Sequence, residues 1–314
     1  MEYYIGIDLG GTNIACGLVN EKYEILLKKS IKTALPRTAT AITEDMAKLA
    51  LSVIYEYGLK KEDIKWIGIG SPGAVNFKTG IVERFNKIHM DFFPMAEMIY
   101  NLTNIKTFLE NDANAAVFGE YLAGSAKEYN EVVMITIGTG IGGGVILNGK
   151  IMRGFNYAAT EFGHMVINQD GRQCSCGRKG CFETLASATG LITTTKEFIE
   201  KYPDTTLKNL DRISGRSAFA EMLKGDNVSK MVVEKYISDL ACGVTNLINI
   251  FQPDVFLIGG GISSEGNSLL CPLREKVAEL SYTKYAKKQT LIKAATLHGD
   301  AGIIGASMLG KQID

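Results

Sequence analysis

The chain has 314 residues, of which 46% are hydrophobic and 22% are charged, as in ordinary globular proteins. Lys plus Arg and Asp plus Glu each number 34, so the net charge is zero and gives no electrostatic basis for binding nucleic acid or an anionic membrane. The length predicts about two domains. We expect no membrane span and no signal peptide, because the apolar runs are short and the first residues already form a strand pattern.

Strand and helix patterns alternate along the first part of the chain, which predicts an α/β domain. The predicted strands are residues 3–9, 14–19, 64–70 and 106–109. The predicted helices are residues 40–57, 94–102 and 112–122. Further along, the pattern indicates a long helix over 228–251, a buried strand over 255–258 and a last helix over 300–309.

The strand–turn–strand pattern of the N-terminus returns later in the chain. Ile7 corresponds to Ile135 and Gly10 to Gly138, a constant offset of 128 residues. Such a repeat predicts two related α/β domains, although two glycine-turn hairpins can also align by chance. We predict a smaller domain of residues 1–122 plus the C-terminal helix 300–314, and a larger domain of residues 123–299.

Three glycine-rich turns are candidates for phosphate or nucleotide binding. Residues 8–12 offer a carboxylate suited to Mg²⁺, backbone N–H groups and a hydroxyl, although any hairpin can turn on two glycines. Residues 138–144 contain five glycines in seven positions, more than a structural turn needs. Residues 259–261 follow a buried strand and fit either an adenosine or a tight packing turn equally well.

One histidine and three cysteines form the most specific motif, and they are His164, Cys174, Cys176 and Cys181. Three thiolates and an imidazole make a closed tetrahedral set that suits a structural Zn²⁺, whereas a catalytic zinc keeps one position open. Redox cysteines are the alternative. Clustered cysteines without a disulfide framework favour a reducing compartment. A zinc here would also hold Glu161 and Glu183 close to the histidine.

Asp112 stands at the start of an alanine-rich helix, after Glu110 and Asn111. A plain helix cap explains an Asp or Asn at this place without any function. The functional alternative is a general base whose carboxylate is kept ionised by the positive end of the helix dipole.

Together these motifs resemble the ROK family, which contains bacterial sugar kinases and sugar-responsive repressors. The resemblance extends from Asp8 to the last helix. It implies the actin-like ATPase (ribonuclease H-like) fold, with two related α/β domains around a cleft and the last helix returned to the first domain. It also implies transfer of the γ-phosphate of ATP to a hexose hydroxyl, with O6 of glucose as the first expectation.

The resemblance further implies a role for each motif. Asp112 would be the general base that accepts the proton of the attacking hydroxyl. The sugar pocket would contain Gly73, Asn86, Asn111, Asp112, Glu161, His164 and Glu183. ATP with Mg²⁺ would bind at Asp8, Gly10, Gly11, Thr12, Gly138, Thr139, Gly140, Gly259, Gly260 and Gly261. His164 would bind Zn²⁺ with one ring nitrogen and a sugar hydroxyl with the other.

Two features bear on the substrate and on the class of protein. After the Pro–Gly loop, Lys87 and Met90 stand where glucokinases of the family are expected to carry Asn and Trp, which leaves fructose, mannose or an N-acetylated hexosamine open. The first strand begins at Tyr3, so we expect no DNA-binding domain ahead of it. A non-catalytic sugar-sensing regulator is the alternative from another class. We expect a cytoplasmic homodimer.

Overall fold

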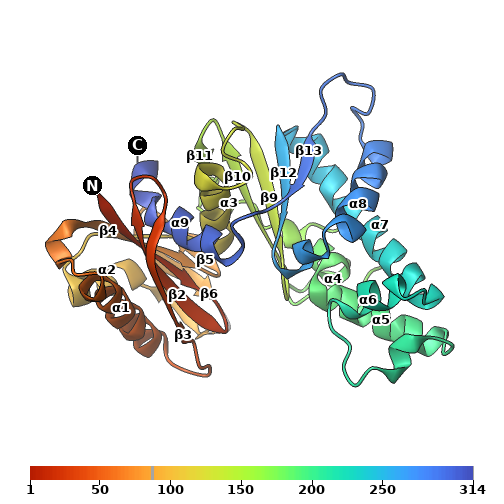
Figure 1. Cartoon of the computed structure of the whole chain (residues 1–314), viewed down its shortest axis with the longest axis horizontal. Helices are drawn as coiled ribbons and strands as arrows, with labels where there is room; N and C mark the ends of the chain where they lie inside the picture. Colours follow the sequence, from red (N-terminus) through yellow and green to blue (C-terminus); the bar gives the residue numbers. More distant parts are fainter. Residues whose placement is uncertain (86–87, 314) are drawn as a thin grey trace. The chain divides into compact units, whose positions relative to one another are not determined.

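The structure is a computed structural model that describes residues 1–85 and 88–313 (Figure 1). The chain divides into two compact units. Unit 1 comprises Met1–Asn130, Gly144–Thr160 and Thr296–Asp314, and unit 2 comprises Glu131–Gly143 and Glu161–Ala295. The domain division at residues 122/123 and 299/300 stays a prediction.

The main sheet of unit 1 has five strands in the order β3-β2-β1-β4-β8. They are β1 (Tyr3–Leu9), β2 (Asn13–Asn20), β3 (Ile25–Lys32), β4 (Ile64–Ser71) and β8 (Thr107–Asn111). The first three are antiparallel neighbours, whereas β1, β4 and β8 run parallel. A small antiparallel sheet consists of β5 (Ala74–Asn76), β6 (Ile81–Phe85) and β7 (Met90–Phe93).

Helices cover both faces of the main sheet, so its central strands are apolar nearly throughout, as parallel strands usually are. α1 (Ala39–Glu56) and α2 (Met95–Thr103) pack against each other on one side (Figure 1). α3 (Asp112–Ala123) and α9 (Ala301–Ser307) pack together on the other side. α1 begins where the side chain of Thr38 accepts a hydrogen bond from the backbone N–H of Ala41.

α9 approaches the sheet so closely that a side chain would not fit between the two backbones. A Cβ atom on Gly68 of β4 would lie 1.7 Å from the carbonyl oxygen of Ala306. On the other side of α9, a Cβ atom on Gly305 would lie 1.7 Å from the carbonyl oxygen of Ala115 in α3. These glycines therefore let α9 pack between α3 and the carboxyl half of the parallel strands.

The second five-stranded sheet has the order β11-β10-β9-β12-β13. Its strands are β9 (Val132–Ile137), β10 (Ile141–Leu147), β11 (Lys150–Ile151), β12 (Val255–Gly259) and β13 (Leu291–Ala294). β9 occupies the place that β1 has in the first sheet, as the 128-residue repeat predicts, and it pairs parallel with β12. The helices of unit 2 are α4 (Phe182–Ala186), α5 (Ala188–Lys201), α6 (Ser217–Leu223), α7 (Asn227–Phe251) and α8 (Asn267–Leu280).

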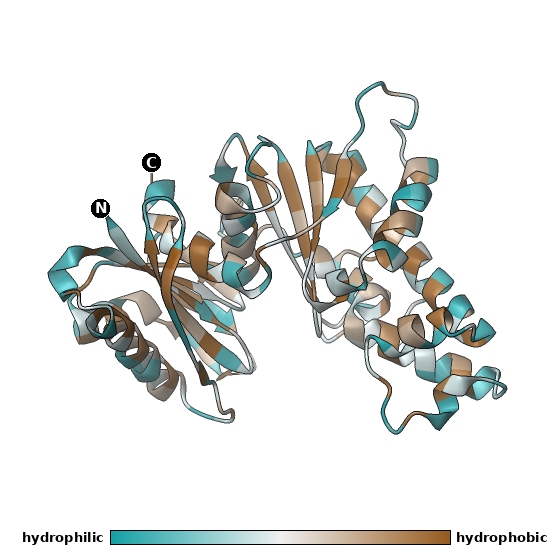
Figure 2. Cartoon of the chain, viewed as in Figure 1, coloured by the Kyte–Doolittle hydropathy of each residue, from teal (hydrophilic) through white to brown (hydrophobic). Residues whose placement is uncertain are grey.

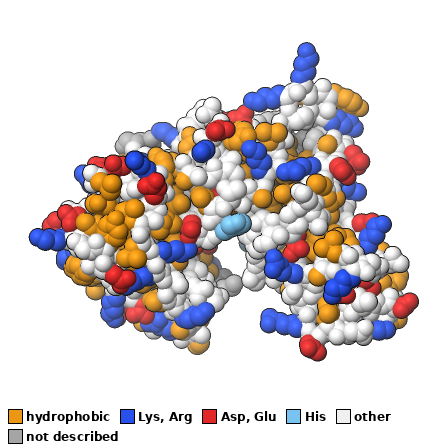
Figure 3. All heavy atoms as spheres, in the orientation of Figure 1, with side chains coloured by type: hydrophobic (Ala, Val, Ile, Leu, Met, Phe, Trp, Pro, Cys, Tyr) orange, Lys and Arg blue, Asp and Glu red, His pale blue; other side chains and the backbone are white. Residues whose placement is uncertain are grey.

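The surface and the core agree with the composition. Figure 2 shows the apolar residues concentrated on the strands of both sheets. On the face drawn in Figure 3, acidic and basic side chains are interspersed over most of the surface, as the zero net charge suggests. Within residues 1–85 and 88–313, no helix combines the length and apolar character that a membrane crossing needs.

We predict that Gly305→Ala lowers the midpoint of thermal unfolding by at least about 5 °C, because the new methyl group would overlap the carbonyl oxygen of Ala115. The matched control is Gly299→Ala, just before α9, where a Cβ atom meets nothing within 4 Å. An unchanged midpoint for Gly305→Ala would show that α9 shifts without cost and that its close packing is not a constraint.

Candidate active site

Two partly exposed carboxylates, Asp8 and Asp112, come close together in unit 1. Asp8 lies near the end of β1, in register with Gly70 of the parallel strand β4. A Cβ atom on Gly70 would lie 3.5 Å from the Cα atom of Asp112, the first residue of α3. On the opposite side, a Cβ atom on Gly302 of α9 would lie 2.9 Å from the carboxylate carbon of Asp8. Four elements, β1, β4, α3 and α9, thus meet at the pair.

Burial perturbs both carboxylates, and the charge of Asp112 adds to the effect at Asp8. Burial first, and then the charge of Asp112, raise the pKa of Asp8 to about 6, while Lys28 lowers it. Burial also raises the pKa of Asp112, against the backbone N–H groups of Ala113 and of Asp112 itself. The helix dipole was expected to keep Asp112 fully ionised, but burial has the larger effect here. A divalent cation would stabilise this pair, and carboxylate oxygens are the ligands that Mg²⁺ prefers, so Asp8 fits a magnesium site.

The glycine turn after β1 is anchored at its base and open at its tip. The backbone N–H of Gly10 donates to the carbonyl oxygen of Asn13 at 2.9 Å, and the Thr33 hydroxyl donates to the carbonyl oxygen of Gly10 at 2.8 Å. Gly11 and Thr12 are exposed. The turn therefore has a fixed shape and a free outer surface, which phosphate binding by backbone amides requires.

Asn111, not Asp112, caps α3. The Asn111 side-chain oxygen accepts hydrogen bonds from the backbone N–H groups of Ala113 and Asn114, at 2.9 and 3.2 Å. Its amide nitrogen donates to the carbonyl oxygen of Gly73 at 3.1 Å. The Asp112 carboxylate accepts the N–H of Ala113, the next residue, at 2.9 Å, and Asn111 links the start of α3 to Gly73. Asn86, the remaining sugar-pocket candidate in this part of the chain, lies outside the described residues.

Sequence reasoning assigned no role to Glu110, although it precedes this group directly. Glu110 is 1% exposed and forms an ion pair with Arg153, whose Nε lies 2.6 Å from its carboxylate. The other carboxylate oxygen accepts hydrogen bonds from the backbone N–H of Asn111 and the side chain of Asn114. A buried carboxylate needs such partners. Through these hydrogen bonds Glu110 holds the first turn of α3 in place. The signal in the sequence was a Glu directly after a predicted strand and directly before a candidate helix cap.

In unit 2 the turn between β9 and β10 is tied to two helices. The backbone N–H of Ala188, which begins α5, donates to the carbonyl oxygen of Gly138, and the Thr189 hydroxyl donates to that of Thr139. Glu183, in the first turn of α4, accepts a hydrogen bond from the backbone N–H of Ile141 at 2.9 Å. Its carboxylate lies so close to Gly140 that a Cβ atom there would be 2.1 Å from it.

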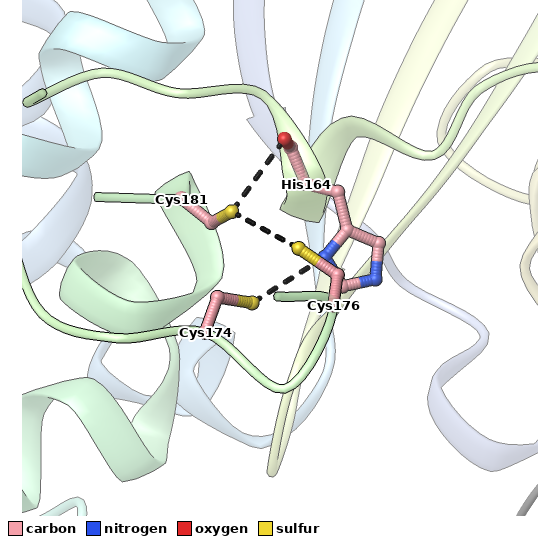
Figure 4. A group of neighbouring side chains, drawn as sticks. All are labelled: His164, Cys174, Cys176 and Cys181. Atoms are coloured by element: carbon pink, nitrogen blue, oxygen red, sulfur yellow. Dashed lines mark hydrogen bonds between the residues drawn. The ribbon is translucent and has the colours of Figure 1, made fainter. Parts of the chain in front are cut away.

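The four metal candidates of the sequence come together, as Figure 4 shows, and they are His164, Cys174, Cys176 and Cys181. Their ligand atoms all lie within 4.8 Å of one another. Nδ1 of His164 is 3.6 Å from the sulfur of Cys174, and the sulfurs of Cys176 and Cys181 are 3.5 Å apart. The other ring nitrogen of His164 points away from the three sulfurs (Figure 4).

This donor set fits a tetrahedral zinc ion. Ligands about 2.3 Å from a zinc are roughly 3.7 Å from one another, close to the separations observed. The backbone N–H of Arg178 lowers the pKa of Cys176 to about 6, which favours a thiolate at neutral pH. Burial and the neighbouring thiols raise the pKa of Cys181 to about 12. Three crowded thiols cannot all ionise without a cation among them, and Zn²⁺ would supply that charge.

Glu161 lies beside this cluster in sequence and at the surface in space. It precedes the short helix η3 (Phe162–His164), and its carbonyl oxygen accepts a hydrogen bond from the backbone N–H of His164. Its side chain is exposed. Glu161 and His164 therefore lie on one turn of unit 2. Glu183 follows the last metal candidate, Cys181, by two residues in the sequence.

The third glycine turn separates into a packed part and an open part. A Cβ atom on Gly260 would lie 2.3 Å from the carbonyl oxygen of Ile137 at the end of β9. On Gly259 it would lie 2.5 Å from the methyl group of Met134. Gly261 has nothing within 4 Å. Packing accounts for Gly259 and Gly260, and only Gly261 offers a free backbone surface to a ligand.

Comparison with known proteins gives consistent matches over nearly the whole chain. A model of the ROK family matches residues 4–313. A glucokinase of Thermotoga maritima is 35% identical over 98% of this chain and 97% of its own length. A xylose repressor of Caldicellulosiruptor bescii is 30% identical over 88% of this chain and 70% of its own length.

Solved structures match as well. The crystal structure of a ROK family glucokinase from Streptomyces griseus, in complex with glucose and AMPPNP, has a TM-score of 0.84 at 32% identity, covering 99% of this chain and 100% of that one. The actin-like ATPase fold predicted from the resemblance is confirmed, and the two five-stranded sheets with the same strand order are its two halves.

We predict that Asp8→Asn raises the midpoint of thermal unfolding by about 2–4 °C at pH 7.5 without Mg²⁺. The folded-state pKa of Asp8 is raised to about 6, so its contribution to stability is complete below the unfolded pKa and is lost as the pH rises through 6. Asn removes that loss, and the difference from the wild type should shrink as the pH falls below 6.

The control for this substitution is Asp211→Asn, at an exposed position of unit 2, which should leave the midpoint unchanged at every pH. A lower midpoint for Asp8→Asn at pH 7.5 would mean that the two carboxylates do not repel each other in the folded protein.

Proposed function

The chain belongs to the ROK family, and on this premise we propose that it is a hexose kinase that transfers the γ-phosphate of ATP to O6 of glucose. The observation that carries the proposal is the electrostatically coupled pair Asp8 and Asp112 beside an open glycine turn. One carboxylate of such a pair can hold a divalent cation while the other takes a proton. The glucokinase relatives, one of them solved with glucose and AMPPNP, support the same assignment.

Asp112 is the general base of this mechanism. Phosphoryl transfer depends mainly on positioning and on stabilising charge, so the protein must orient the sugar hydroxyl and accept its proton. Burial raises the pKa of Asp112, which makes its carboxylate a better proton acceptor than an exposed Asp. The cap from Asn111 fixes the first turn of α3 and with it the direction of this carboxylate.

We assign the sugar to two groups of residues. Gly73 and Asn111, which are already joined by a hydrogen bond, and Asp112, the next residue, would hold the hydroxyls near the reacting atom. Glu161, His164 and Glu183 would hold other hydroxyls of the ring, and Asn86 is assigned to the same pocket. The imidazole would use the ring nitrogen that points away from the thiols.

ATP with Mg²⁺ would bind at the three glycine turns. Asp8 would hold the cation or its waters, and Mg²⁺ would neutralise charge that develops on the phosphates. The backbone of Gly10, Gly11 and Thr12, and that of Gly138, Thr139 and Gly140, would hold phosphate oxygens. At the third turn the adenosine would lie against Gly261, with Gly259 and Gly260 shaping the backbone behind it.

We assign a structural Zn²⁺ to His164, Cys174, Cys176 and Cys181. Bound there, the ion would crosslink the loop ahead of α4 and supply no reactive position, because all four ligand places are filled. Ligation through Nδ1 would fix the orientation of the imidazole and the protonation of its other nitrogen. It would also fix the start of α4, which carries Glu183.

Glucose is favoured over the other hexoses. Met90 is a weak argument against glucose, because this side chain is fully buried in the core of unit 1. It can affect a sugar only through its neighbours. Lys87 lies outside the described residues. The xylose repressor relatives keep a sugar-sensing regulator as the alternative. We further propose a cytoplasmic location and a homodimer, in line with the reduced cysteines and the family.

The proposal is tested by incubating zinc-replete protein with Mg²⁺, ATP and one of five sugars, and identifying the phosphorylated product by ³¹P NMR. The sugars are glucose, mannose, fructose, N-acetylglucosamine and N-acetylmannosamine. We expect glucose 6-phosphate to form fastest. Sugar binding without turnover of any of the five would favour the regulator.

We predict that Asp112→Asn lowers kcat by about 10³-fold, because the variant lacks the proton acceptor. Glucose affinity by calorimetry should stay within about threefold of the wild type, since Asn still accepts hydrogen bonds and Asn111 still caps the helix. Glu128→Gln, at an exposed site of unit 1, should retain full activity. Turnover within tenfold of wild type would remove Asp112 from the mechanism.

We predict that Cys176→Ser loses bound zinc and binds glucose about tenfold more weakly, because the imidazole of His164 is no longer held. Zinc content is measured by atomic emission and glucose affinity by calorimetry. Cys271→Ser is the matched control, since Cys271 is also an exposed cysteine and lies on α8, outside the cluster. A zinc-free variant with unchanged glucose affinity would separate the metal site from the sugar site.

A further inference from the structure

Unit 1 contains a cavity of about 730 Å³ that is separate from the groups assigned to catalysis. Its walls come from the β5–β6 turn, α2, the start of β8, the segment after β11 and residues 312–313. No described residue that we assign to the sugar, to ATP or to a metal lines it. Its volume is within the range of small-molecule sites, which commonly hold ligands of the size of a mononucleotide.

The lining of this cavity combines aromatic faces with positive charge. Phe77 and Phe108 lie nearly parallel, with ring centroids 6.4 Å apart and planes at 17°. Tyr100 and Tyr157 add two further rings. Such surfaces bind flat or ring-shaped groups by stacking and by burial of apolar area.

Two lysines supply the charge. The ammonium group of Lys106 lies 5.0 Å from the ring centroid of Phe108, and Lys78 lines the same cavity. Neither lysine has an ion-pair partner among the residues that the structure describes. Among the described lining residues Glu97 is the acidic one, against two lysines and Arg153, so their summed charge is positive. An ammonium group without a partner is well suited to a phosphate oxygen.

A single side chain joins this cavity to the start of α3. The guanidinium of Arg153 lies 3.8 Å from the ring centroid of Phe77, and its Nε donates to the buried carboxylate of Glu110. Nη2 of Arg153 is buried and has no hydrogen-bond partner among the described residues. Glu110 in turn accepts the backbone N–H of Asn111, the residue before the general base. A shift of Phe77 would therefore reach the catalytic helix through one ion pair.

We propose that this cavity is a regulatory site for a phosphate monoester carried on a ring, such as a hexose phosphate or a mononucleotide. The ring lies against Phe77 and Phe108, and the phosphate lies between Lys78 and Lys106. Occupancy changes kcat by altering how Arg153 holds Glu110. The binding part stands on the cavity alone, whereas the effect on kcat rests on the proposed kinase activity.

The chain carries its own reporter for binding. Trp66 is the single tryptophan, and its ring meets the ring of Phe108 edge-on, with centroids 5.9 Å apart and planes at 80°. Its fluorescence is recorded during titration with AMP, glucose 6-phosphate or inorganic phosphate. Glucose and AMPPNP are present at saturation so that the proposed catalytic sites are filled. We expect a saturable change with at least one ester and a weaker one with inorganic phosphate.

Two lysine variants locate the site. Lys106→Gln should weaken ester binding about tenfold, the loss expected for one charge-assisted hydrogen bond, and should leave basal kcat unchanged. Lys127→Gln removes an exposed lysine elsewhere in unit 1 and should bind the ester like the wild type. Equal affinity in the Lys106→Gln and wild-type proteins, or no saturable change with any probe, overturns the site. Inorganic phosphate binding as tightly as the esters overturns the role of the ring.

The coupling is measured separately, as kcat at saturating glucose and ATP with and without the ester that binds. We expect kcat to change in the wild type and to change at correspondingly higher ester concentration in Lys106→Gln. An unchanged kcat with the cavity filled overturns the coupling through Arg153. If the wild-type protein binds the ester by fluorescence but has no kinase activity, the result counts against the proposed function and not against the cavity.

Discussion

The close packing of α9 against the first sheet is the constraint on which the catalytic groups depend. Gly68 and Gly305 let the backbone of α9 lie against both β4 and α3, and Gly302 brings it against Asp8. The same packing holds the start of α3 beside the end of β1, so two carboxylates share a poorly solvated space. Their mutual repulsion is a cost to stability that a cation and a substrate offset, which is common at functional sites.

In the second unit, a cluster of one histidine and three cysteines lies where functional side chains are positioned, as the glycine-packed helix does in the first unit. The cluster ends at Cys181, α4 begins at the next residue, and Glu183 of its first turn holds the backbone of Ile141 beside the glycine turn. One ion at the cluster would therefore order a histidine, a glutamate and a phosphate-binding turn together. A structural metal thus bears on function through the side chains that it orients.

The sequence predicted the repeated strands, the long helices and the gathering of His164 with three cysteines, because each has a strong local pattern of hydrophobicity or spacing. It did not predict β3, the small sheet β5–β7, α8 or β13, whose patterns are weaker or depend on partners distant in sequence. It left Asn111 and Asp112 as alternative caps, and only the backbone hydrogen bonds separate them. The pairing of Glu110 with Arg153 needs the fold, since 43 residues separate the two.

In the proposed mechanism the carboxylate of Asp112 takes the proton of the sugar hydroxyl. Burial raises the pKa of this carboxylate. The most direct measurement is the pH dependence of kcat at saturating glucose, ATP and Mg²⁺. We predict that kcat falls on the acid side with a midpoint above the ordinary pKa of an aspartate, about 3.9. A kcat that stays constant down to about pH 4 would contradict it, because a base protonated by then could not be required.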